Sequence, residues 1–268
     1  MTNANPDGLG FVGTGTITAA IVTGLCLDTD FDVPITVSPR NAVVASELAQ
    51  RFGHVHVARS NQDVLDRSRI VFLAVRPQIA DDVIHDLKFR TDHHVISLIA
   101  TYSLERISAL VAPAGDCVCA VPQPTVAARA GPTVQFPPDA LTASLFKRLG
   151  PVVEVDSEVE FRALFAATSA MAAHFAWLDA MTAWLVRHAI DPSRARAYVA
   201  SMFQGLGGVP ISSAKTFDEL SQEFKTRGGL NEQFAGHLAE RHVFESCATG
   251  LDAIFERLSN ASGTPRVA

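Results

Sequence analysis

Several residue types that mark special classes of protein are scarce in this chain of 268 residues. The four cysteines do not have the spacing of zinc ligands, so we expect a reduced, cytoplasmic protein without a metal site. Lys and Arg number 22 against 28 Asp and Glu, and they form no basic run. Because binding to nucleic acid needs clustered positive charge, we do not expect nucleic acid as a partner.

Long uncharged hydrophobic runs are also missing. The N-terminal residues 1–7 are polar, and glycines interrupt the apolar run that follows, so no signal peptide is expected. The most apolar long segment, residues 163–190, contains His174, Asp179 and Arg187. A membrane span carries few or no charges, so we expect a buried helix here and no membrane partner.

The apolar content of the chain and the order of its patterns predict two domains. Hydrophobic residues make up 48% of the chain and charged residues 19%, which is enough apolar material for two cores. In the first half, short apolar runs alternate with helical patterns, with strands expected at 9–12, 35–38, 55–57, 70–75, 95–99 and 117–121 and helices at 17–25, 42–52, 61–67, 79–87 and 104–111. This alternation predicts a parallel sheet covered by helices on both faces, an α/β Rossmann domain over residues 1–155.

From about residue 159 only helical patterns remain, which predicts an all-α domain over residues 156–268. One long helix is expected at 161–188 and another from Pro192, which follows the N-cap Asp191. Thr216 opens a capping box, and Asn231 is expected to cap a last helix that runs to 258. The helix at 163–185 is apolar on nearly every face, which predicts a homodimer in which this domain is the dimerisation domain.

The strongest motif in the sequence follows the first expected strand. It reads Gly-Phe-Val-Gly-Thr-Gly-Thr-Ile-Thr, with glycines at 10, 13 and 15, and it lies between a strand and a helix. This is the context of the dinucleotide fingerprint, in which a tight turn brings the helix N-terminus to the pyrophosphate. The third small residue of the fingerprint is replaced by Thr18. The predicted contacts are Gly10, Gly13, Thr14, Gly15, Thr16 and Ile17; the alternative is a glycine-rich turn that binds nothing.

The end of the second expected strand indicates which dinucleotide binds. Enzymes that prefer NAD place an Asp or Glu there to hold the ribose 2′-hydroxyl, but this sequence reads Ser38-Pro-Arg40-Asn41. Ser38, Arg40 and Asn41 are therefore predicted to bind a 2′-phosphate, with NADP as the cofactor. An ordinary surface arginine is the alternative for Arg40.

Together with later segments, these motifs resemble the pyrroline-5-carboxylate reductase family. The matching pieces are 10–15, 38–41, Leu73-Ala-Val-Arg-Pro-Gln78, Val95–Ala100, Val121-Pro122, 156–185 and Gly228-Gly229. The resemblance covers nearly the whole chain in order. It implies NADPH as hydride donor, reduction of a cyclic C=N bond to a secondary amine as part of proline biosynthesis, and a dimer-forming helical domain.

By the same resemblance, Ala74, Val75, Arg76 and Pro77 line the cofactor below the adenosine ribose and pyrophosphate, and Pro122 is a further cofactor contact. For Arg76-Pro77, a turn at the end of a strand is the structural alternative.

Segments that the family uses near the substrate are altered in this sequence. Val121-Pro-Gln-Pro-Thr125 replaces Met-Pro-Asn-Thr-Pro, Thr168–Ala173 replaces Gly-Ser-Gly-Pro-Ala-Tyr, and Thr226-Arg-Gly-Gly-Leu-Asn231 replaces Ser-Pro-Gly-Gly-x-Thr. These departures predict a related reaction on a different substrate. The candidate catalytic and substrate residues are Ser169 and Asp179 on the long helix, with Thr226, Arg227, Gly228, Gly229 and Asn231 in the loop.

The loop 226–231 also has an interpretation that needs no family. It precedes a helix N-terminus, where free backbone N–H groups bind anions, and Arg227 adds a contact for a carboxylate. A Gly-Gly helix stop followed by an Asn cap is the purely structural alternative.

Two other functions compete with imine reduction. A hydroxyacid dehydrogenase of the phosphogluconate-like group places a lysine on the helix between its domains, but 161–188 contains no lysine. An NADP-binding protein without catalysis is the second, because a fold does not guarantee chemistry.

Overall fold

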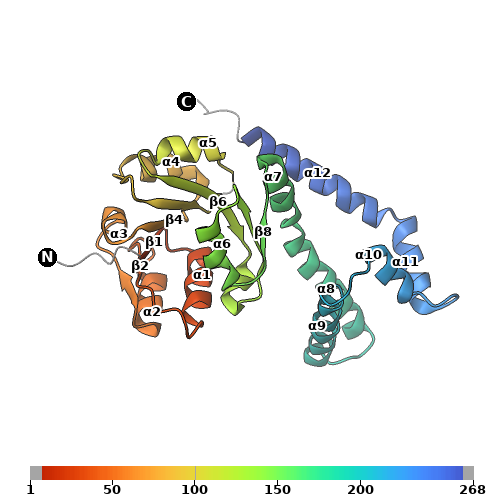
Figure 1. Cartoon of the computed structure of the whole chain (residues 1–268). Helices are drawn as coiled ribbons and strands as arrows, with labels where there is room; N and C mark the ends of the chain where they lie inside the picture. Colours follow the sequence, from red (N-terminus) through yellow and green to blue (C-terminus); the bar gives the residue numbers. More distant parts are fainter. Residues whose placement is uncertain (1–7, 100, 262–268) are drawn as a thin grey trace. The chain divides into compact units, whose positions relative to one another are not determined.

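The computed structural model describes residues 8–99 and 101–261, so that Ala100, the end of one matching segment, lies outside the described residues. The chain divides into two compact units (Figure 1). The first comprises the chain up to residue 166 together with the end of the last helix from residue 255, and the second comprises 167–254. The first unit therefore extends beyond residue 155, the boundary expected from the sequence.

The first unit is built on one eight-stranded sheet with the order β3-β2-β1-β4-β5-β6-β7-β8. Its strands are β1 Leu9–Val12, β2 Ile35–Val37, β3 Val55–Val57, β4 Ile70–Leu73, β5 His94–Ser97, β6 Asp116–Pro122, β7 Thr133–Phe136 and β8 Val152–Glu154. Its helices are α1 Thr16–Cys26, α2 Ala42–Arg51, α3 Asn61–Arg67, α4 Pro77–His85, α5 Leu104–Leu110, η1 Pro124–Ala128, α6 Ala140–Lys147 and α7 Glu158–Ala167. The predicted Rossmann-like fold is confirmed.

Alternation along each central strand builds two cores, one on each face of the sheet. Phe11 and Phe72 face the layer of α1, α2 and α6, where their rings stack with centroids 4.4 Å apart. Val12 and Leu73, the next residues along, face α3, α4 and α5. Since successive side chains in a strand point to opposite faces, a four-residue strand such as β1 is fully buried only when helices cover both sides.

One part of this unit was not expected from the sequence. No element was predicted between residue 122 and residue 155, but β7, α6 and β8 lie there. β7 pairs antiparallel with β6, whereas every other pair in the sheet of the described residues is parallel. The sheet is therefore mixed at one edge.

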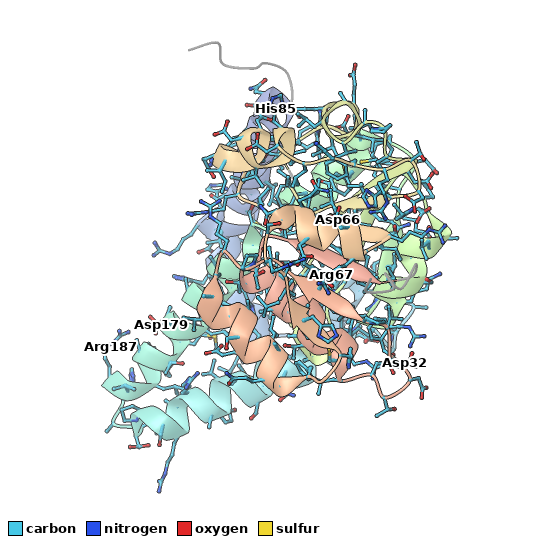
Figure 2. All side chains as sticks on the ribbon, turned by 90° about the vertical axis from the view of Figure 1, so that its left-hand side faces the viewer. Asp32, Asp66, Arg67, His85, Asp179 and Arg187 are labelled. Atoms are coloured by element: carbon cyan, nitrogen blue, oxygen red, sulfur yellow. The ribbon has the colours of Figure 1, made fainter. Side chains whose placement is uncertain are left out.

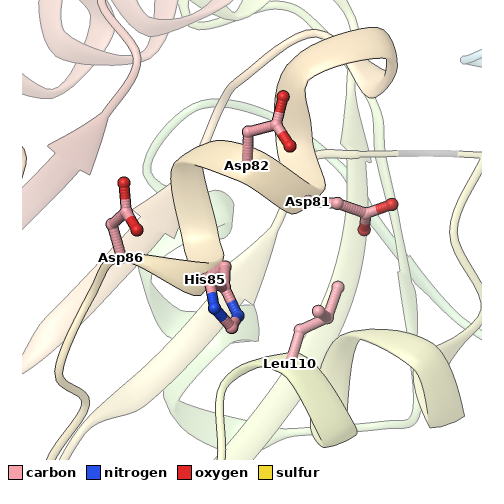
Figure 3. Close-up of a pocket in the computed structure, with 5 residues that line it drawn as sticks. All are labelled: Asp81, Asp82, His85, Asp86 and Leu110. Atoms are coloured by element: carbon pink, nitrogen blue, oxygen red, sulfur yellow. The ribbon is translucent and has the colours of Figure 1, made fainter.

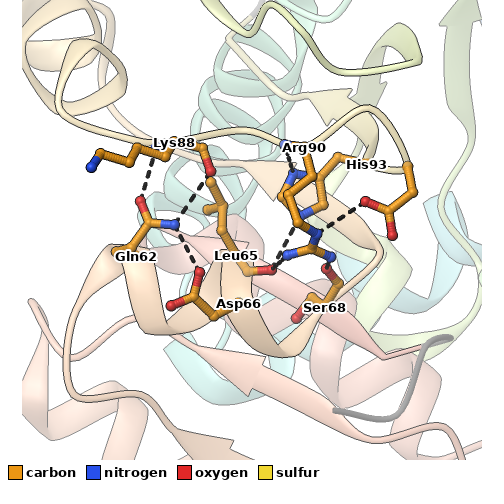
Figure 4. Close-up of polar contacts among 8 residues, drawn as sticks. Gln62, Leu65, Asp66, Ser68, Lys88, Arg90 and His93 are labelled. Carbon is orange, nitrogen blue, oxygen red and sulfur yellow. Dashed lines mark hydrogen bonds and ion pairs between the residues drawn. The ribbon is translucent and has the colours of Figure 1, made fainter.

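The C-terminus of α3 shows how distant side chains hold a short helix in place (Figure 4). The Arg90 guanidinium donates to the carbonyl oxygens of Leu65 at 2.7 Å and Ser68 at 3.1 Å. The buried His93 ring contacts the Leu65 carbonyl through Nε2 at 3.1 Å. The last carbonyls of a helix lack the usual partners inside it. The Leu65 carbonyl also accepts from the Ser68 N–H at 3.3 Å, so the two side chains add to that bond, and Arg90 gives the Ser68 carbonyl a donor.

The second unit is helical and leaves much apolar surface exposed. It contains α8 Ala170–Arg187, α9 Pro192–Gly208, α10 Phe217–Glu223, α11 Leu230–Glu240 and most of α12 Val243–Ala261. No residue of α8 is buried, and Phe175 and Trp184 are 68% and 51% exposed. None of the described helices is long and apolar enough to cross a membrane.

Two predicted helices in this half are wrong in their limits. The single helix expected at 161–188 is interrupted at Thr168-Ser169, where the Met171 N–H bonds to the Thr168 carbonyl in a tighter turn. Ser and Thr side chains compete for backbone hydrogen bonds, which makes such a pair a natural break. The helix expected from Asn231 to 258 is two helices, because His242 adopts a left-handed conformation with φ of 54°. Its N-cap is Gly229, and Asn231 lies inside the first turn.

Candidate active site

The glycine loop after β1 lies where the strand order reverses. β1 and β4 are neighbours, and the chain proceeds from them towards opposite edges of the sheet, the place where ligands bind in open α/β folds. Gly13 has a φ of 103°, and a Cβ there would lie 2.4 Å from the carbonyl oxygen of Ala74, the residue after β4. Glycine at 13 is therefore required by the fold itself.

The start of α1 is suited to an anionic ligand. Gly15 is the N-cap, and no side chain caps the first turn or places an acid in it. Gly15 has an extended backbone (φ −98°, ψ −167°), and a Cβ added to it would meet no described atom within 4 Å. The free N–H groups of this helix and the open space beside Gly15 fit the pyrophosphate of a dinucleotide. Thr16 is exposed and Ile17 half-buried at the same turn, whereas Gly10 is buried within β1.

The three residues predicted to bind the 2′-phosphate differ in accessibility. Arg40 and Asn41 are exposed just before α2. Neither side chain forms a hydrogen bond or ion pair with another described residue, so both are free to bind a ligand. Ser38 is fully buried, and its Oγ accepts a hydrogen bond from the Gly13 N–H at 2.9 Å. The sequence alone did not reveal that contact across 25 positions.

The segment after β4 brings the next predicted contacts to the same edge of the sheet. The Ala74 N–H bonds to the Val12 carbonyl at 2.8 Å, which fixes this segment beside the glycine loop. Arg76 is exposed and serves as the N-cap of α4, and Pro77 is the first residue of that helix. Pro122 is buried at the end of β6, two strands away from β4 in the sheet order. The turn interpretation of Arg76-Pro77 is thus compatible with a cofactor contact.

The predicted residues of the second unit are solvent-accessible on its helices. Ser169 lies at the break before α8, and Asp179 lies on α8 with its side chain exposed (Figure 2). His174 is also exposed, and its ring contacts Phe175 on α8 and Phe203 on α9. The Ser169 side chain makes no capping hydrogen bond to the first turn of α8.

The loop 226–231 lies beside a negative charge, the carboxylate of Glu232 in the first turn of α11. Gly228 has a left-handed φ of 71°, and its N–H donates to the carboxylate of Glu232 at 2.7 Å. Asn231 Nδ2 donates to the Phe224 carbonyl at 3.0 Å, which ties α11 to the end of α10. Glu232 was not singled out in the sequence, although an acid in the first turn of a helix is a known capping pattern. The Glu232 carboxylate thus occupies the Gly228 N–H, while Arg227 remains exposed.

Other titratable groups of the described residues include those that line a hollow and two buried thiols. An open hollow of about 340 Å³ lies between α4 and α5, lined by Asp81, Asp82, His85, Asp86 and Leu110 (Figure 3). Asp81 is paired there with Arg106. Burial raises the pKa of Cys117 to about 11 and raises that of Cys119 further, so both thiols stay protonated. No metal-binding group of three or more His, Cys, Asp or Glu occurs among the described residues.

Comparisons with known proteins agree with this arrangement. Residues 8–101 match the family model described as NADP oxidoreductase, coenzyme F420-dependent, and residues 158–261 match that for pyrroline-5-carboxylate reductase dimerisation. A pyrroline-5-carboxylate reductase of Vibrio alginolyticus is 25% identical over 93% of this chain and 95% of its own. One from Haemophilus influenzae is 24% identical over 93% and 95%.

Solved structures show the same fold. The pyrroline-5-carboxylate reductase of Coxiella burnetii has a TM-score of 0.83 at 24% identity and covers 97% of this chain and 100% of that one. The Plasmodium falciparum enzyme, solved with NADP bound, has a TM-score of 0.82 at 15% identity, with coverage of 97% and 99%. A reductive aminase of Aspergillus terreus in complex with NADPH has a TM-score of 0.57 at 16% identity, with coverage of 76% and 75%.

Each half of the chain thus matches a family model, in the order that the fold requires, and the curated relatives match over nearly the whole length. The low identity agrees with the altered segments around Thr226–Asn231 and Thr168–Ala173. This chain is a divergent member of the pyrroline-5-carboxylate reductase family, an NADP-dependent oxidoreductase with a Rossmann N-terminal domain and a helical C-terminal domain.

Proposed function

We propose that this protein uses NADPH to reduce a cyclic imine, of the type of pyrroline-5-carboxylate, to a secondary amine. The observation that carries the proposal is the uncapped N-terminus of α1 beside the open space at Gly15, in a chain whose second half matches the dimerisation family. Free Arg40 and the lack of an acid after β2 support NADPH over NADH.

The residues required for this reaction are few. The bound nicotinamide supplies the hydride, and a substrate imine that arrives protonated needs no general acid from the protein. The work of this chain is to bind the pyrophosphate at the Gly13–Gly15 loop, to hold the 2′-phosphate with Arg40 and to exclude water from the reacting atoms.

The loop 226–231 of the second unit is proposed to contact the substrate. Arg227 adds a positive charge to the loop, but Glu232 already provides a carboxylate to the Gly228 N–H. We therefore propose a substrate other than pyrroline-5-carboxylate itself, because the Glu232 carboxylate already occupies an N–H group that could bind the carboxylate of that substrate. The exposed apolar faces of α8 support a homodimer in which this unit is completed by a second copy.

A screen of NADPH consumption tests the proposal. Five- and six-membered cyclic imines, each with and without a carboxylate, are offered to the purified protein, and loss of absorbance by NADPH is followed. Turnover of at least one imine supports imine reduction. In a parallel assay hydroxyacids are offered with NADP⁺, and formation of NADPH from them would instead support the phosphogluconate-like alternative. NADPH binding without turnover of either class would favour the non-catalytic protein.

A further inference from the structure

The backbone N–H and the backbone carbonyl of Gly13 each form a hydrogen bond with a buried side chain. The Gly13 N–H donates to Ser38 Oγ at 2.9 Å, and Thr18 Oγ1 donates to the Gly13 carbonyl at 2.6 Å. Thr14 Oγ1 donates to the Ser38 carbonyl at 2.7 Å and lies 3.1 Å from Ser38 Oγ. Thr18 and Ser38 are fully buried, and Thr14 is 3% exposed. These contacts connect the end of β2, the glycine loop and the first turn of α1.

The hydroxyl protons of Thr14, Thr18 and Ser38 are all donated in hydrogen bonds within the protein. A hydroxyl has one proton to donate, and Thr14 gives its proton to the Ser38 carbonyl. In the contact between the two hydroxyls, Ser38 must therefore be the donor and Thr14 the acceptor. Ser38 then has no proton left for a phosphate oxygen, which accepts hydrogen bonds only. Thr18 likewise donates its single hydroxyl proton to the Gly13 carbonyl.

We propose that Thr18 and Ser38 are positioning residues that preset the glycine loop for the pyrophosphate, and that Ser38 does not read the 2′-phosphate. The inference rests on the dinucleotide site of the proposed function. A loop already held in its binding conformation loses less conformational freedom when a ligand binds, so affinity rises for any dinucleotide. This also explains why Thr18 can replace the small third residue of the fingerprint: its hydroxyl closes the turn from within.

Binding of NADPH and NADH to four variants tests the inference. Thr18→Val keeps the shape of Thr18 without the hydroxyl, and Ser38→Ala removes the second contact. Each should weaken both nucleotides by about tenfold, the scale of one buried hydrogen bond lost, and leave the ratio of the two dissociation constants unchanged. Thr18→Ser retains the hydroxyl and should bind both nucleotides with dissociation constants within about twofold of those of the unmodified protein. Arg40→Ala is the contrasting control, because it should change the ratio.

Fluorescence titration gives the dissociation constants, and denaturant unfolding of each variant without nucleotide gives its stability. Unchanged nucleotide binding by both Thr18→Val and Ser38→Ala would overturn the inference. So would a loss confined to NADPH in Ser38→Ala, which would return Ser38 to the 2′-phosphate. Should Thr18→Val fail to fold, Ser38→Ala and the Thr18→Ser comparison decide. Failure of the unmodified protein to bind either nucleotide would refute the proposed cofactor itself and is distinguishable from these results.

Discussion

Arg40 should determine the preference for NADPH over NADH. Since the Ser38 hydroxyl is committed to the glycine loop, the positive charge for the 2′-phosphate comes from Arg40 at the start of α2. A charge-assisted contact contributes about 1–3 kcal/mol, and the exposure of Arg40 places this one towards the lower end. Arg40→Ala should therefore weaken NADPH binding by about 5–30-fold and leave NADH binding within about twofold.

The stability of the folded protein should not change in this variant. The Arg40 side chain forms no hydrogen bond or ion pair with another described residue, so its removal leaves no buried group unpaired. Lys88→Ala is a matched control, because it removes one positive charge from the loop before β5, whereas Arg40 follows the carboxyl end of β2. Arg40→Lys should retain part of the preference, since it keeps the charge without the planar fork of guanidinium.

The assay is a fluorescence titration with both nucleotides at low and high salt. NADPH binding by the unmodified protein should weaken more with salt than NADPH binding by Arg40→Ala, because salt screens the exposed pair. Equal or tighter binding of NADH by the unmodified protein would refute the reasoning. An identical loss in Lys88→Ala would show that the effect comes from net charge and not from a contact.

Four further outcomes are expected. Arg90→Ala should lower the free energy of unfolding by about 1–3 kcal/mol, because the Leu65 and Ser68 carbonyls at the end of α3 lose the hydrogen bonds from the guanidinium. Urea denaturation measures this loss, and an unchanged midpoint would contradict it. Burial and the nearby Arg90 charge hold the pKa of His93 below its ordinary value of 6.5, so its contribution to stability is complete above pH 6.5 and declines as the pH falls through and below that value. Unfolding measured from pH 7 to pH 5 should show a smaller slope in His93→Gln, and an equal slope would exclude the effect. Light scattering should show a dimer at micromolar concentration, whereas a monomer would remove the role proposed for α8. For a carboxylated imine, Arg227→Ala should raise KM without changing NADPH affinity, and robust reduction of pyrroline-5-carboxylate unaffected by Arg227→Ala or Asn231→Ala would leave the loop as a helix cap.

The sequence predicted the central sheet well because its signals are local. Continuous apolar runs such as Ile70–Leu73 and the strand-loop-helix context of Gly13 are visible within a dozen residues. The strand β7 and its neighbours were missed because their pattern is short. β7 has four residues and β8 three, and residues such as Thr133 and Gln135 are polar although they are fully buried. Such a strand is recognised only when the elements that cover it are known.

The candidate site was predictable in its residue types but not in its contacts. The glycine spacing and the missing acid after β2 could be read directly, whereas the partner of Ser38 lies 25 positions away. The expected cap at Asn231 was wrong because glycine, with no side chain, occupies the N-cap, and Asn231 bonds to Phe224 instead. Local propensity identifies which residues can cap or bind, but tertiary packing selects the partner.

The two glycines of the loop separate folding from ligand binding. Gly13 is fixed by its left-handed backbone and by the Ala74 carbonyl, so any side chain there disturbs the fold before a nucleotide is present. Gly15 has an ordinary extended backbone, and a methyl group there would meet no described atom within 4 Å. A homologue that lost the cofactor could therefore accept another residue at position 15 and keep its fold. The same homologue could not accept another residue at position 13. Selection for ligand binding would therefore keep glycine at position 15, and selection for the fold would keep glycine at position 13.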